Sequence, residues 1–99
     1  MRLTAMISVI PIGAGLSLSP YVAACEKVLR EAGLKPVLHA HGSNVEGEWD
    51  MVMSALKRCH EVLHEMGVPR IATLVKMGTR TDKEISMKAA VRSVEEKLG

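Results

Sequence analysis

The sequence predicts an α+β fold in which a four-stranded antiparallel sheet is covered by two helices, with a further helix at the C-terminal end. Three observations support this fold class. The chain has 99 residues, enough for one domain, which we expect to span residues 1–99. Apolar residues make up 47% and charged residues 24%, as in globular proteins rather than disordered ones. The hydrophobic pattern also alternates between strand and helix spacing, in the order β-α-β-β-α-β-α.

The first strand and the first helix are bounded by local signals. Residues 3–12 are rich in strand-forming side chains, and the strand ends at the breaker cluster of residues 13–15. Ser19 is predicted to cap the first helix, with Pro20 at its first position. Apolar residues then recur at helical spacing until Gly33, which is predicted to end the helix.

A hairpin and the strongest helix follow. Residues 36–41 are predicted to form a short strand, residues 42–44 a turn, and residues 45–46 a brief return strand. The next helix carries an apolar stripe about 100° wide, because its apolar residues step by three and four positions between Trp49 and Met66. A glycine and a proline directly after this stripe prevent the helix from continuing.

The last strand and helix complete the order of elements. Residues 70–77 are strand-rich, and residues 81–84 form a capping-box pattern that predicts the start of a last helix. One face of that helix carries Met87, Val91, Val94 and Leu98. The first six elements have the order of a split βαβ unit, so the predicted architecture is a ferredoxin-like βαββαβ sandwich with an extra C-terminal helix.

Both faces of the central strands are apolar. In the first strand one face carries Leu3, Ala5, Ile7 and Val9, and the other carries Met6, Ile10 and Ile12. Two crossover helices can cover only one face of a sheet, so we expect the second face to meet the last helix or another subunit. The sequence therefore predicts an oligomer in which sheets pack against sheets.

Composition and charge exclude several classes of function. The formal net charge of +2, from 13 basic and 11 acidic residues, is too balanced to indicate a nucleic-acid groove or a membrane-surface patch. Phe is absent and only one Trp and one Tyr are present, which disfavours a platform for stacking RNA bases. We expect a cytoplasmic protein, in which Cys25 and Cys59 lie on apolar helix faces as small buried hydrophobes.

Histidines provide the main argument for an enzyme. His39 and His41 are spaced to share a strand face, and His60 and His64 are spaced to share a helix face, so each pair could bind a metal if further ligands were near. A metal-dependent enzyme built on these four residues is therefore one alternative. No cysteine or serine lies in a context typical of a nucleophile, and we assign no catalytic residue and no metal ligand.

Three segments concentrate polar groups where a ligand could bind. Residues 11–19 link a strand to a helix start, where free N–H groups and two hydroxyls are available. Residues 41–48 place several polar side chains before the main helix, and Glu46 among them would need a donor if it pointed inward. Residues 76–83 gather cations before a helix start. Each segment also has a plain alternative as a capping loop or a solvated turn.

Taken in order, these segments resemble a known family. The chain is similar to the thiamine-binding (YkoF-type) family of small ferredoxin-like proteins over almost its whole length. The matching segments are Ser8–Gly13, Ser17–Val22, Gly42–Glu48, Arg80–Lys83 and Ser93–Glu95. Many members of that family have threonine where this chain has Ser43, a departure that keeps the hydroxyl group.

The resemblance implies a non-catalytic protein that binds thiamine or its hydroxymethylpyrimidine part and assembles as a dimer of dimers. An aminopyrimidine could donate to a carboxylate such as that of Glu46, and serine hydroxyls could complete the contacts. The ligand-binding residues predicted on this basis are Ile12, Gly13, Ser17, Ser19, Ser43, Glu46 and Trp49. No cofactor, nucleic acid or membrane partner is expected. The alternative function is that of a structural or regulatory oligomer that binds another small metabolite.

Overall fold

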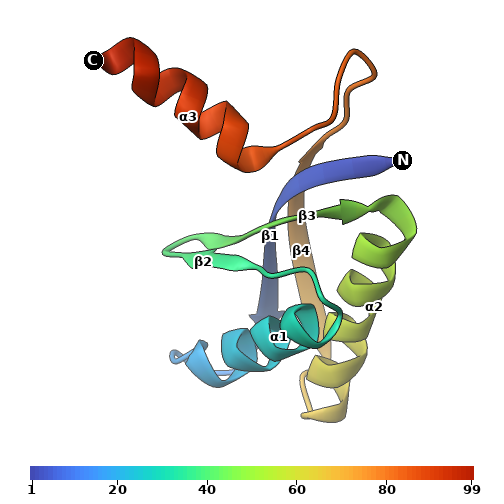
Figure 1. The fold of residues 1–99 in the computed structure, drawn as a ribbon. Helices are drawn as coiled ribbons and strands as arrows, with labels where there is room; N and C mark the ends of the chain where they lie inside the picture. Colours follow the sequence, from blue (N-terminus) through green and yellow to red (C-terminus); the bar gives the residue numbers. More distant parts are fainter.

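A computed structural model describes residues 1–99, with four strands and three helices (Figure 1). In chain order the elements are β1 (Arg2–Ile12), α1 (Ser19–Glu31), β2 (Val37–His39), β3 (Gly42–Glu48), α2 (Trp49–Glu65), β4 (Arg70–Gly78) and α3 (Met87–Leu98). The strands form one sheet in the order β2-β3-β1-β4, and all neighbours are antiparallel. This confirms the predicted α+β, ferredoxin-like architecture with an added C-terminal helix.

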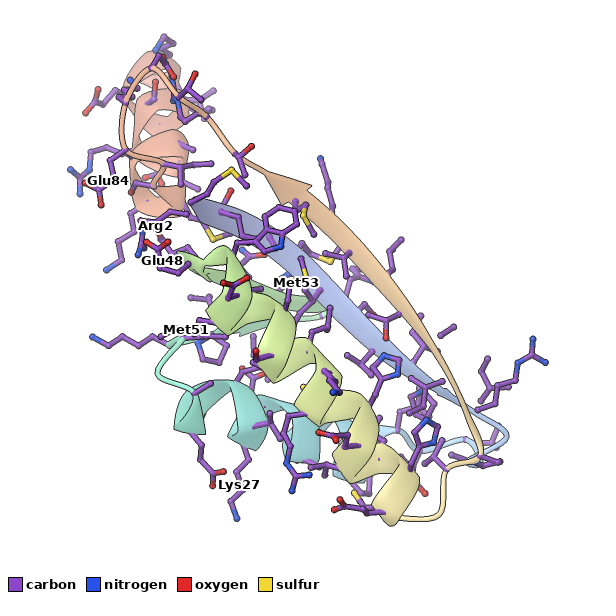
Figure 2. The ribbon with its side chains drawn as sticks, turned by 90° about the vertical axis from the view of Figure 1, so that its right-hand side faces the viewer. Arg2, Lys27, Glu48, Met51, Met53 and Glu84 are labelled. Carbon is purple, nitrogen blue, oxygen red and sulfur yellow. The ribbon has the colours of Figure 1, made fainter.

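The core lies between the sheet and the first two helices. Figure 2 shows α1 and α2 on the same side of β1 and β4. Leu3, Ala5 and Ile7 of β1 are buried against this layer, while the residues between them are only partly buried, because successive side chains of a strand point to opposite faces. The largest fully buried side chains are Leu3, Leu29, Leu63, Val45, Val52 and Cys59, which come from β1, β3 and both covering helices.

The hairpin differs from its prediction because β3 is longer than expected. The strand starts at Gly42 rather than at residue 45, and its residue Ser43 pairs with Ile7 of β1. Glycine is needed at position 42, since a Cβ added there would collide with the carbonyl oxygen of Ile7. The turn-like composition of residues 42–44 therefore reflects a close approach between two strands.

The starts of α1 and α3 also differ from their predictions. Leu18, without a side-chain cap, precedes α1, so the prediction of Ser19 as the cap was wrong by one position, while the proline lies in the first turn as predicted. The predicted capping box at residues 81–84 was wrong, because α3 is capped by Ser86, whose Oγ accepts from the N–H of Ala89 at 3.2 Å.

The carboxylates of the predicted capping box have other partners. Arg80 donates twice to Asp82, from Nε to Oδ1 at 2.7 Å and from its terminal nitrogen to Oδ2 at 2.5 Å. Glu84 lies 4.0 Å from Arg2 at the N-terminal end of β1, and Figure 2 shows both side chains at the same end of the molecule. A local sequence pattern did not reveal these partners.

The second face of the sheet, here called the open face, points away from α1 and α2. It includes Met6, Ser8, Ile10, Ile12, Asn44, Glu46, Ala72, Leu74 and Lys76, as the strand register shows. Leu74 remains 58% exposed on this face. Figure 1 shows α3 projecting beyond the end of the sheet, and none of its residues is buried. We had expected either the last helix or another subunit to pack on this face, and α3 of the same chain does not pack there.

Candidate functional site

A cavity of about 920 Å³ lies between α1 and the edge of the sheet. Its walls come from Ile7–Ile10 of β1, from one side of α1 along its whole length, and from residues 38–43 of the β2–β3 hairpin. Leu16 and Leu18 of the loop before α1 also line it. Figure 1 shows that these segments, distant in sequence, surround one end of the molecule. The cavity has a mostly apolar lining, as small-molecule sites usually do.

A buried carboxylate lies in the wall of this cavity. Glu26 of α1 is only 7% exposed and Ser43 of β3 only 6%. The Ser43 hydroxyl donates to Oε2 of Glu26 at 2.7 Å, whereas Oε1 is buried and has no hydrogen-bond partner. Burying a carboxylate without its full set of donors is costly, so Oε1 is an unsatisfied acceptor in the cavity wall.

Two histidines of the hairpin stand at the rim of the cavity. The backbone N–H of His41 donates to Nδ1 of His39 at 3.3 Å, so Nδ1 is the acceptor and the ring proton lies on Nε2. Nε2 of His39 then donates to Oδ1 of Asn44 at 3.1 Å. Both ring nitrogens of His39 are thus occupied within the hairpin, and the ring lies on the same face of the sheet as Asn44.

The two cysteines lie beneath the cavity and are buried, free thiols. Cys25 lines the cavity floor, and the Cys59 thiol donates to its carbonyl oxygen at 3.8 Å. Contact with the Cys25 thiol, together with burial, raises the pKa of Cys59 well above its usual value, so Cys59 remains protonated at neutral pH. The same contact lowers the pKa of Cys25. The prediction that both residues lie on buried helix faces is confirmed.

The structure brings together only part of the predicted set of ligand-binding residues. Ser19 and Ser43 line the cavity. Ile12, Gly13 and Ser17 lie near its open end but are exposed and do not line it. The segment of residues 11–19 thus contributes Ser19 and two leucines rather than its glycines.

Glu46 and Trp49 lie elsewhere. Glu46 is three positions after Ser43 in β3, so the two side chains point to opposite faces of the sheet. The Glu46 carboxylate lies on the open face, 3.7 Å from the Arg2 guanidinium. Trp49 begins α2 and donates its backbone N–H to the Met1 carbonyl at 2.8 Å, away from the cavity.

Sequence reasoning missed Glu26. It stands four residues after Val22 and three before Leu29, beside the apolar stripe of α1. A carboxylate at such a flank position usually reaches solvent, and it is buried here because the hairpin folds over this side of α1. The spacing alone therefore gave only a weak signal.

The four histidines do not form a metal centre. Thr73 on β4 and Nε2 of His60 are hydrogen-bonded at 2.5 Å, and Nδ1 of His64 lies 2.7 Å from the carbonyl oxygen of Val68. These two residues flank α2, whereas the other two histidines belong to the hairpin. No group of three or more His, Cys, Asp or Glu side chains is placed to hold a metal ion.

Comparison with known proteins places the chain in a family. The family model described as thiamine-binding protein matches residues 5–95. The chain belongs to the thiamine-binding protein family. It is 50% identical to a UPF0045 protein of Synechocystis sp. over 96% of this chain and 78% of that protein. It is 44% identical to a UPF0045 protein of Eremothecium gossypii over 93% of this chain and 89% of the other.

Solved structures of similar proteins share the fold. A protein of Methanocaldococcus jannaschii that is 30% identical superposes with a TM-score of 0.89, covering 96% of this chain and 97% of the other. A protein of Thermotoga maritima, described as a candidate thiamine biosynthesis or salvage protein, is 19% identical and superposes with a TM-score of 0.80, covering 95% and 99%. None of the helices in this family member has the length and apolarity needed to span a bilayer.

Proposed function

We propose that this protein binds thiamine, or its hydroxymethylpyrimidine part, in the cavity between α1 and the β2–β3 hairpin, without catalysing a reaction. The observation that carries the proposal is the buried Oε1 of Glu26, a residue that lines the cavity, because this oxygen has no donor within the protein. An exocyclic amino group on an aromatic ring is the matching donor, and membership of the thiamine-binding family supports a ligand with such a group.

The remaining contacts follow from the lining. Ser43 holds Oε2 of Glu26, which fixes the carboxylate plane, and Ser19 offers a hydroxyl nearby. Apolar side chains of β1, α1 and the loop before it form walls for a flat ring. Each hydrogen bond is worth about 0.5–1.5 kcal/mol net, so a few of them together with burial of the ring support roughly micromolar affinity.

The role we propose is sequestration, delivery or salvage of this ligand in the cytoplasm. A reversible binding site of roughly micromolar affinity suits a protein that takes up and releases a small molecule. The description of the Thermotoga maritima protein as a candidate for thiamine biosynthesis or salvage agrees with this role.

We further propose that the protein is a homotetramer, a dimer of dimers in which open faces pack together. Ile10, Ile12 and Leu74 leave apolar surface exposed on the open face, and no helix of the chain covers it. Exposed apolar surface of this kind is typical of contacts between subunits.

The test of the site compares two carboxylates in isothermal titration calorimetry with thiamine and with hydroxymethylpyrimidine. Glu26→Gln removes the negative charge and replaces one of the two acceptor oxygens by an amide donor, and we expect it to weaken binding by about tenfold or more, because a hydrogen bond to a charged group is worth about 1.5–3 kcal/mol. Glu46→Gln is the matched control on the open face, where the sequence had predicted the ligand contact.

The outcomes of this titration distinguish the two possible locations of the site and test the identity of the ligand. Loss of affinity in Glu46→Gln with full affinity in Glu26→Gln would move the site to the open face, as the sequence predicted. If the parent protein shows no heat with either compound at millimolar concentration, the ligand is wrong. A thermal-shift screen of other small metabolites then tests the alternative of an oligomer with a different ligand, since binding raises apparent stability.

A further inference from the structure

Where β1 lines the cavity, one of its two edges has no neighbouring strand. β3 pairs with β1 only from Arg2 to Ile7, whereas β4 pairs with it as far as Ile12. Beyond Ile7, β1 therefore has a neighbour on one side only. The free side begins where Ser43 ends the β1–β3 ladder, and Ile7–Ile10 line the cavity.

The backbone groups that reach this free edge can be identified. A Cβ at Gly42 would collide with the carbonyl oxygen of Ile7, so that oxygen points toward β3. In a strand the N–H and C=O of one residue point to the same edge, and successive residues alternate between the two edges. The polar backbone groups of Val9 and Pro11 therefore point to the same edge as those of Ile7, and those of Ser8 and Ile10 point to β4.

The proline supports this assignment. Pro11 pairs with Ile71 in the register of the β1–β4 ladder, although proline has no N–H to contribute. Within sheets proline is tolerated where its nitrogen faces an unpaired edge, as it does in this alternation. The free edge thus offers one donor, the N–H of Val9, and two acceptors, the carbonyl oxygens of Val9 and Pro11.

We propose that the backbone of Val9 forms two hydrogen bonds with the ligand, at an edge where a donor stands beside an acceptor. The Val9 N–H donates to the ring nitrogen next to the exocyclic amino group, and the Val9 carbonyl accepts one hydrogen of that amino group. The second amino hydrogen goes to Oε1 of Glu26, whose oxygen has no other donor. The site is therefore selective for flat heteroaromatic rings with an amino group beside a ring nitrogen. This selectivity rests on the proposed function.

This edge is too short to serve a peptide strand. A docked strand needs donors and acceptors at every second residue, and Pro11 lacks the donor that would extend the ladder past Val9. One residue with both groups, enclosed by α1 and the hairpin, suits a small planar molecule with two adjacent polar atoms.

The test is amide hydrogen exchange measured by NMR on the full chain, with and without saturating hydroxymethylpyrimidine. Without ligand we expect the Val9 amide to exchange faster than those of Ser8 and Ile10, which serve as matched neighbours bonded to β4. With ligand we expect the exchange of the Val9 amide to slow by roughly tenfold, as one hydrogen bond predicts, while Ser8 and Ile10 change little.

Two results would overturn the inference. Protection of the Val9 amide equal to that of Ser8 in the unliganded protein would mean that the edge is not free. Calorimetric binding of hydroxymethylpyrimidine without a change at Val9 would leave the proposed function in place and remove this contact. Absence of calorimetric binding would instead remove the proposed function and this inference together.

Discussion

Glu26 shows how one residue can combine a stability cost with a binding role. Its carboxylate is buried beside Ser43, and one oxygen has no partner inside the protein. Proteins tolerate such groups mainly where a ligand or another function needs them, because an apolar residue would be less costly to bury. The carboxylate should therefore be a local weak point of the unliganded fold.

Glu26→Leu tests this stability cost. We expect the free energy of unfolding in urea to rise by about 1 kcal/mol, since the substitution removes a buried carboxylate oxygen without a partner. Glu31→Leu, an exposed position on the same helix, is the control and should change stability by less than about 0.5 kcal/mol. A clear loss of stability in Glu26→Leu would mean that the contact with Ser43 outweighs the burial cost.

Asp82 provides a prediction for pH dependence. The hydrogen bonds from Arg80 lower the pKa of Asp82 to about 2, below its ordinary value. A carboxyl group whose pKa is lower in the folded state stabilises the fold above its unfolded pKa. That contribution is lost as the pH falls from the ordinary Asp range through about 2.

The measurement is a carbon-13 NMR titration of the Asp82 carboxyl group. Arg80→Ala should return its pKa to the ordinary range, because the guanidinium is the largest cause of the shift. An unchanged titration in that variant would show that Arg80 does not hold the carboxylate in solution.

At the scale of elements, the β2–β3 hairpin depends on the close approach of Gly42 to β1. Gly42→Ala forces a Cβ against the Ile7 carbonyl, and we expect it to lower the unfolding free energy by more than about 1 kcal/mol. Gly78→Ala at the end of β4 is the matched control, since its Cβ would meet only Thr4 Oγ1 at 4.0 Å. Chemical denaturation measures both variants, and equal effects would argue against the close approach.

The elements also show which features the sequence could predict. The strand-rich run of β1 and the apolar stripe of α2 predicted two core elements, because buried elements select apolar side chains at many positions. The start of α3 and the length of β3 were missed. Asp82 and Glu84 bind arginines instead of capping a helix, and residues 42–44 have turn composition within a strand.

The site was predicted only in part for a similar reason. Ser43 and Ser19 were selected for their polarity and do line the cavity. Glu26 and Glu46 are both carboxylates beside apolar residues in sequence, and only tertiary packing decides that the first is buried and the second lies beside Arg2. Contacts between segments distant in sequence are not visible in local spacing.

At the scale of the whole molecule, the open face determines the predicted assembly. Leu74→Glu places a charge on this apolar surface, and we expect sedimentation to show a smaller species than the parent protein, which we propose to be a homotetramer. Met51→Glu is the control, because Met51 is similarly exposed but lies on α2, on the other side of the sheet (Figure 2). A Leu74→Glu protein with the mass of the parent would contradict packing through this face.

The detached C-terminal helix α3 has a consequence for how assembly can be followed. It has 12 residues and buries none of them within its own chain, and isolated helices of fewer than roughly 12–15 residues are marginal in water. In the proposed tetramer, neighbouring subunits would supply the packing that keeps this helix ordered, so we expect progressive dilution to unwind it while the sheet stays intact. Far-ultraviolet circular dichroism against protein concentration would thus report subunit dissociation without any attached label.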